Sequence, residues 1–362
     1  MDSADLKAQT KKIQYLGSHA HQRAVDSDRP QHHSKSYAQR LENNQSPPLY
    51  TQYPTWQVSM PKRVSSHTSP SESPLLPPKR ENKSLLSASP PPPIPEDLLK
   101  QSCGNLVTWL GGPYAVLLQI AAPGIALGSC THSRFQTHPI SRFRRTAAFI
   151  MAVVHGTEEQ KALICGAIKK QHSFINGPSY TATDPELQKW TAATLFVAGQ
   201  LTQDLLSVDQ NPMPRAQKEV LCQQFGRFAT ALDMPAEMWP SSLEEFEAYF
   251  DEQIRTIEIT EASKKVANIL LREMELPWLL IWTLPVMRVL MAVWLPARIR
   301  MAFGLPDPRG WLVWAAYWVV VLSIWCANWL MSGRVKVVIV SWMKKDMARA
   351  AEDIRVHGRW MI

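Results

Sequence analysis

One histidine, His172, is the residue of this sequence best placed to do chemistry. It ends a stretch, about 158–174, whose pattern predicts a helix opened by the capping sequence Thr157-Glu158-Glu159-Gln160. Imidazole is a common metal ligand, but a lone histidine is more often a capping or partly buried structural group. Haem needs only one protein ligand and an apolar slot. The neighbouring helices supply apolar faces, with Phe149, Val153 and Val154 on one and Leu163, Ile164 and Ile168 on the other.

A basic cluster precedes this histidine. Arg142, Arg145 and Thr146 are spaced i, i+3 and i+4 near the start of a helix expected over about 141–154, so they share one face. The dipole and free amides of a helix N-terminus also favour an anion. Such a face would suit haem propionates, or a bound oxygen species that needs a hydrogen-bond donor. A solvated basic face is the alternative.

Other familiar chemistries lack their residues. The sequence has no GxSxG elbow, no P-loop, no GxGxxG after a strand and no HExxH. Its five cysteines are scattered and include no CxxC, which argues against a disulfide framework and against a zinc site. Among the remaining histidines, His132 has two open interpretations: it orients a neighbouring group at the site, or it caps a turn.

The formal net charge of +8 is not gathered into one basic face. This distribution argues against a nucleic-acid partner, and beside a long apolar segment it fits a membrane surface better. The polar N-terminus has no apolar run after its charges, so no secretory signal is predicted.

The positioning elements are expected to be helices. Residues 1–95 hold half of the 28 prolines and no periodic apolar runs, which predicts a disordered Pro/Ser-rich tail. Residues 96–345 are expected to form one all-α domain, and 346–362 a polar C-terminal helix. The stretch 335–342 could be a short strand or a continuing helix. Further helices are expected over about 185–206, 213–232, 242–257 and 260–273.

Two apolar segments, 277–296 and 311–331, mark the C-terminal third. The second has no charge over about 21 residues, long enough to cross a bilayer. Eight of the fourteen tryptophans lie between Trp278 and Trp329, and tryptophan favours membrane interfaces as well as ordinary cores. We expect membrane association; packing of 311–331 against the domain is the alternative.

An ordered series of motifs resembles one oxygenase family. It is the family of the fungal mycophenolic-acid-pathway oxygenase MpaB and the bacterial rubber oxygenase, latex clearing protein. The resemblance covers about 98–330, and its order over that length is more specific than any single motif. The matching residues are Gly111-Gly112, Leu117 to Ala121, Pro123, His132 to Phe135, Pro139, Arg142, Thr146, Gly156-Thr157, His172, Gly177, Tyr180 to Leu187, Trp190, Phe246, Tyr249 to Asp251, Leu295 to Arg300 and Gly304 to Pro306.

This resemblance implies a globin-related helical bundle with additional helices, b-type haem with its iron, and dioxygen chemistry on C=C bonds of isoprenoid chains. His172 matches the proximal haem ligand. Arg142 and Thr146 match polar groups near the haem. Arg145 stands where the rubber oxygenase has a distal lysine, and it is bulkier and stays charged.

Two departures from the family pattern bear on haem binding. Many members have histidine at the positions of Ala122 and Ala192. The expected function is a haem-dependent oxygenase acting with dioxygen on a hydrophobic, isoprenoid-type substrate. It would be membrane-associated, at the endoplasmic reticulum with a cytosolic catalytic domain. The alternatives are a membrane-anchored binding protein that has lost the cofactor, and a haem oxidase that does not cleave the chain.

Overall fold

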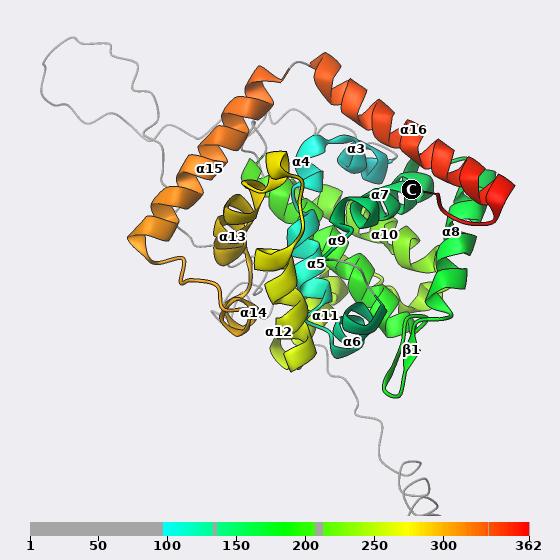
Figure 1. Ribbon diagram of the computed structural model, residues 1–362, viewed down its shortest axis with the longest axis horizontal. Helices are drawn as coiled ribbons and strands as arrows, with labels where there is room; N and C mark the ends of the chain where they lie inside the picture. The colour runs from blue at the N-terminus through cyan, green and yellow to red at the C-terminus, as the bar shows by residue number, and fades with distance from the viewer. Residues whose placement is uncertain (1–96, 133–135, 207–212, 332, 362) are drawn as a thin grey trace, which may run out of the picture. The chain divides into compact units, whose positions relative to one another are not determined.

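The computed structural model describes residues 97–132, 136–206, 213–331 and 333–361, and in these ranges its regular structure is almost all helix (Figure 1). The predicted all-α fold is confirmed. The tail expected over 1–95 lies outside the described residues. The first helices are α3 (Leu98–Gly104), α4 (Leu106–Trp109), α5 (Gly112–Gln119), α6 (Pro123–His132), α7 (Pro139–His155), α8 (Glu158–His172) and α9 (Pro185–Leu206).

The second half continues in the same way. Its elements are α10 (Arg215–Thr230), η1 (Ala236–Met238), α11 (Leu243–Thr256), α12 (Glu261–Asn268), the π-helical η2 (Ile269–Glu273), η3 (Trp278–Leu280), α13 (Thr283–Trp294), α14 (Ala297–Ala302), α15 (Trp311–Leu330) and α16 (Gly333–His357). The stretch 335–342 is helical, and α16 runs through residues 345 and 346 without a break. Between α8 and α9, the two-residue strands β1 (Asn176–Gly177) and β2 (Tyr180–Thr181) pair antiparallel.

Helix α9 is the centre of the main core. Most of its residues are buried, and it packs against α4, α5 and α10. Trp190 stacks on Phe250 of α11 at a centroid distance of 5.3 Å, and its Nε1 donates to the Leu118 carbonyl at 3.1 Å. A Cβ at Gly111 would lie 2.7 Å from the Ala198 carbonyl oxygen, so only glycine permits this close approach.

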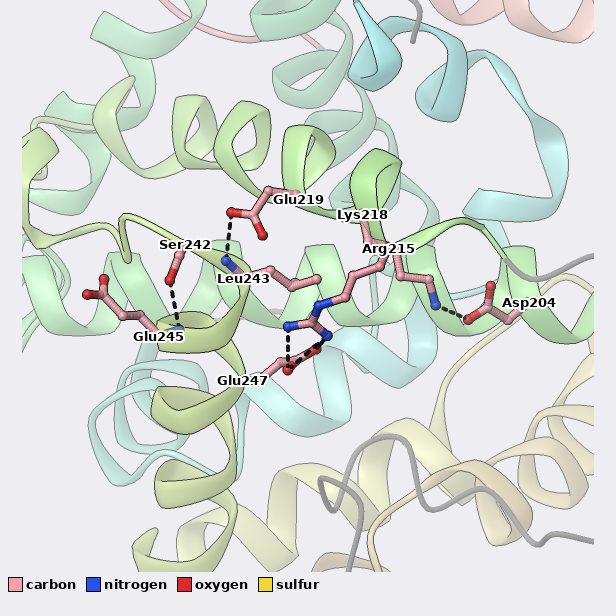
Figure 2. A network of polar contacts seen from close by, with 8 residues as sticks. All are labelled: Asp204, Arg215, Lys218, Glu219, Ser242, Leu243, Glu245 and Glu247. Carbon is pink, nitrogen blue, oxygen red and sulfur yellow. Dashed lines mark hydrogen bonds and ion pairs between the residues drawn. The ribbon is translucent and has the colours of Figure 1, made fainter. Parts of the chain in front are cut away.

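A polar network joins α9, α10 and α11 at the edge of this core (Figure 2). Arg215 donates to both carboxylate oxygens of the buried Glu247, from Nη1 to Oε1 at 3.1 Å and from Nη2 to Oε2 at 3.3 Å. Lys218 pairs with Asp204 at 2.7 Å, and Glu219 accepts from the backbone N–H of Leu243 at 2.9 Å. The network therefore fixes the start of α11 against α10.

A second apolar cluster joins α16 to the helix pair α7 and α8. Figure 1 shows α16 lying along both helices, in red. One ion pair accompanies this packing: Arg144 of α7 grips Asp346 of α16 with two hydrogen bonds, one of them from Nε to Oδ2 at 3.0 Å. The cluster consists of Ala147, Ala148, Met151, Ala152 and Ile164 against Met343, Met347, Ala350, Ala351 and Ile354.

His155 ends α7 near both α3 and α16. Its Nε2 atom is buried without a hydrogen-bond partner. The pKa of the ring is lowered to about 4, first by burial, then by the cations of Lys344 and Lys100. Asp97 opposes this shift. The folded protein therefore holds His155 neutral at physiological pH.

By length and composition, one unbroken helix in the described ranges, α15, could cross a membrane. Two further membrane spans would be possible only if each of two bent pairs of consecutive helices formed a single span. These pairs are residues 106–119 with 123–132, bent by 101°, and residues 261–273 with 278–294, bent by 102°.

Removing the charge of Asp346 should destabilise the fold. The Asp346 side chain is 7% exposed and that of Arg144 30%, so Asp346→Asn leaves a partly buried guanidinium without its anion. We expect a loss of about 2 kcal/mol in unfolding free energy, measured by thermal unfolding. Glu352→Gln is the matched control, because Glu352 forms a comparable ion pair with Arg355, within α16, that is exposed to solvent. Equal effects of the two changes would contradict the prediction.

Acid should destabilise the protein partly through His155. Its pKa is about 4 in the folded state, below the ordinary value, so between about pH 6.5 and 4 the unfolded chain binds more protons and stability falls as pH falls. Because the ring is only partly buried, solvent screening reduces this contribution, which is on the order of 1 kcal/mol at pH 5. His155→Gln should lose less stability than wild type between pH 7.5 and 5 in denaturant titrations. Parallel losses would refute this.

Candidate functional site

The site predicted from the sequence lies on a helical hairpin formed by α7 and α8. Pro139 stands in the first turn of α7, and Thr157 caps α8 in a reciprocal box with Gln160, with hydrogen bonds of 3.2 and 3.0 Å. Gly156 makes the turn possible, since a Cβ there would lie 2.6 Å from the Ala152 carbonyl oxygen. Only Gly156 and Thr157 separate the two helices, so the start of α7 returns beside the end of α8.

This hairpin brings Arg142 next to His172, thirty positions apart in the sequence. His172 is partly buried, and its Nδ1 atom is buried without a hydrogen-bond partner. The pKa of the ring is lowered, first by burial and then by the positive charge of Arg142. His172 therefore presents a neutral imidazole with an unengaged ring nitrogen, the state that binds a metal.

Arg142 and Arg145 form a cationic pair beside this histidine. The pKa of Arg142 is lowered to about 10, first by burial and then by the charge of Arg145. Arg142 nevertheless keeps solvent-accessible surface. Its guanidinium is thus crowded by protein yet still reachable, a setting in which an anion would be attracted strongly.

Thr146 lies one turn further along the same side of α7. Its hydroxyl donates to the carbonyl of Arg142 at 3.1 Å, within the helix. The hydroxyl oxygen is solvent-accessible as an acceptor, but its proton is already engaged. In this rotamer Thr146 can donate to a ligand only after breaking that bond. Arg144, between these residues, points the other way and pairs with Asp346.

The turn after α8 holds the end of that helix in place. The backbone N–H of Ile175 donates to the His172 carbonyl at 3.0 Å. A Cβ at Gly177 would lie 2.2 Å from the Tyr180 ring, so this position requires glycine. Helix α6 packs on the same turn, since a Cβ at Gly128 would lie 3.4 Å from both Ile175 and Tyr180.

His132 is not joined to this group by any contact among the residues that the structure describes. It is exposed at the end of α6, and its neighbours Ser133 to Phe135 lie outside the described residues. Sequence reasoning also gave no role to His155, whose unpaired ring nitrogen only the fold reveals.

Ala122 and Ala192, the two departures from the expected family pattern, are both buried in the main core. In the described part of the chain, no three His, Cys, Asp or Glu side chains converge on a point where they could hold a metal ion. The single imidazole of His172 is therefore suited to a metal that brings its other ligands with it, as porphyrin iron does.

Comparison with known proteins identifies the family of the domain. Residues 101–323 match the model of a family described as "ER-bound oxygenase mpaB/B'/Rubber oxygenase, catalytic domain". Two mycobacterial relatives are the uncharacterized proteins Mb2261 of Mycobacterium bovis and Rv2237 of Mycobacterium tuberculosis. Each is 31% identical over 158 residues, which cover 40% of this chain and 59% of the relative.

The chain thus spans about three fifths of the length of these curated relatives. No solved structure matches it. The family match covers more than half of the 362 residues and includes α5 to α14, with the hairpin that carries His172, Arg142, Arg145 and Thr146. The chain belongs to the family of mpaB-type and rubber oxygenases and carries its catalytic domain.

Proposed function

We propose that this protein is a haem b-dependent, membrane-associated oxygenase that cleaves a C=C bond of a hydrophobic, isoprenoid-type substrate with dioxygen. One observation carries the proposal: in an oxygenase-family domain, His172 offers an unpaired, partly buried, neutral imidazole beside the accessible cation of Arg142. When bound, haem would supply the redox-active iron that such chemistry needs.

His172 is the residue assigned to hold the iron. A metal ligand must be deprotonated. Burial and the charge of Arg142 lower the pKa of this imidazole, so it stays neutral at pH values below the ordinary pKa of histidine. Its buried Nδ1 has no hydrogen-bond partner, which supports a role other than a structural hydrogen bond for this nitrogen.

The basic residues of α7 are assigned to anionic partners. Arg142 would hold the carboxylates at the haem periphery, because it is cationic, crowded and accessible. Arg145 would add charge on the same face or polarise a bound oxygen species, with Thr146 as a hydrogen-bonding partner after its rotamer changes. His132 remains a predicted cofactor-binding residue that would orient a neighbouring group at the site.

The reaction balances without an added reductant. Cleavage of one C=C bond by one dioxygen molecule places one oxygen atom on each carbon and gives two carbonyl groups.

A hydrophobic substrate would reach such a site from a membrane. We therefore place the protein at the endoplasmic-reticulum membrane, with the catalytic domain in the cytosol. The charge-free helix α15 supports membrane association.

A binding protein that has lost the cofactor is the second candidate. The observation that favours it is that Ala122 and Ala192, at which the resemblance would place histidine, are buried in the apolar core and offer no ligand there. Haem content separates it from the leading proposal, and the mass of the products separates cleavage from oxidation without cleavage.

Haem binding should depend on His172 and not on His155. Both histidines have a buried, unpaired ring nitrogen, so His155→Ala is a matched control for His172→Ala. We expect a Soret band from the wild type and from His155→Ala, and loss of at least about nine tenths of it in His172→Ala, because the ligand bond is removed. Absorbance spectra before and after dithionite make the measurement.

The opposite pattern, or a colourless wild type from haem-replete cells, would overturn the proposal. In the first case His155 would be the ligand, and in the second the binding-protein candidate would stand.

Removing Arg142 should shift the pH dependence of haem binding. Its charge lowers the pKa of His172, so Arg142→Gln raises that pKa and protonation begins to compete with the metal at higher pH. When haem binding is measured against pH, the pH at which binding is lost on acidification should therefore rise. The rise is limited, because burial, the larger cause of the lowered pKa, remains in the variant. Arg145→Gln, which removes the other cation of the pair, should raise this pH less. Equal shifts would contradict the assignment.

A further inference from the structure

Helix α15 has two different sides. Its inner side is attached to the domain near the middle of the helix, where Tyr317 is 8% exposed and Val321 is 1% exposed. The Tyr317 hydroxyl accepts from Nε1 of the buried Trp294 of α13 at 3.4 Å. Its outer side is apolar and open to solvent, with Leu312, Val319, Leu322, Trp329 and Leu330 exposed. Figure 1 shows α15, in orange, beside α13.

This attachment ties any membrane crossing by α15 to the position of α13. A 20-residue helix is about 30 Å long, the thickness of the hydrocarbon layer, so α15 could cross only with its whole length in lipid. Tyr317 and Val321 are the seventh and eleventh of its residues, and they are held by the core. A crossing α15 would therefore break these contacts or pull α13, with its Arg288, into the bilayer.

A second apolar projection lies at the other end of α13. The five residues Trp278 to Trp282 precede that helix, and all are exposed, with Trp278 at 79%. Five consecutive exposed large apolar side chains are unusual for a water-facing loop. Because η3 leads directly into α13 and α15 packs on α13, both projections belong to one structural unit.

The chemistry of these surfaces fits a lipid interface better than another protein. Tryptophans stand at both ends of the charge-free helix, at Trp311 and Trp329, as in segments that sit at headgroup depth. Exposed cations flank the helix: Arg309 lies before α15, and Lys344 and Lys345 lie after it. Such cations are attracted to anionic headgroups.

We propose that α15 lies in the plane of the membrane as an anchor in one leaflet, with Trp278–Trp282 as a second point of insertion, and does not cross the bilayer. A helix in this orientation buries its outer apolar side among the acyl chains while its inner side stays on the protein. This inference rests on the membrane association proposed above and specifies its form.

The two ends of α15 should then lie on the same side of the membrane. The exposed native thiols are first removed by Cys130→Ser and Cys326→Ala. Two variants of the full chain are then made on this background, one with Arg309→Cys and one with Lys345→Cys. Sealed microsomes, recovered by flotation, are treated with a membrane-impermeant maleimide before and after permeabilisation. We expect both positions to behave alike. Protection of one position only, or absence of the protein from floated membranes, overturns the proposal.

Binding of the purified chain to phosphatidylcholine vesicles containing some phosphatidylserine tests the second insertion point. Trp278→Ser with Trp282→Ser should weaken flotation about tenfold, whereas Phe174→Ser, at an equally exposed aromatic outside the patch, should not. Equal flotation of the two variants would refute the role of Trp278–Trp282. The Soret band of the same preparations reports haem separately, so loss of haem and loss of anchoring are distinguishable.

Discussion

The close approach of the start of α7 to the end of α8 is the constraint on which the candidate site depends. It places the charge of Arg142 against the ring of His172, and burial and that charge act in the same direction on the pKa of the ring. The approach itself follows from a two-residue connection in which Gly156 is sterically required. Without this hairpin the basic cluster and the histidine would be unrelated features of the chain.

Helix α16 adds a second constraint on the same hairpin. It begins after residue 323, where the family match ends, yet it supplies half of the apolar cluster on α7 and α8 and the carboxylate that grips Arg144. The basic cluster with Thr146 at the start of α7 is therefore divided between two tasks. Arg144 fastens the helix to α16, and Arg142, Arg145 and Thr146 remain on the side of His172.

The apolar C-terminal region links this site to its surroundings. Helix α15 connects directly to α16, so the segment proposed to meet the membrane is continuous with the segment that covers the hairpin. The buried Trp294–Tyr317 contact holds α15 to α13. In this arrangement the anchor and the candidate site belong to one packed body, which would keep the site at a constant distance from the lipid surface.

Local chemistry accounts for most of what could be predicted from the sequence. The apolar periodicity, the Thr157–Gln160 capping box, the prolines at the starts of α6 and α7 and the charge-free run of α15 are properties of neighbouring residues, and the helices formed where those signals stand. The i, i+3, i+4 spacing likewise placed Arg142, Arg145 and Thr146 on one side. The roles of these residues, and of His172, remain predictions.

Contacts between distant segments were decided only by the tertiary structure. Arg144 and Asp346 are 202 positions apart, so no local pattern could separate Arg144 from the other cations of its cluster. Composition alone allowed α15 to cross a bilayer, but Tyr317 is buried against Trp294 of α13 and Val321 lies in the main core. The unpaired ring nitrogens of His155 and His172 depend in the same way on which helices surround them, and a sequence carries no local record of such neighbours.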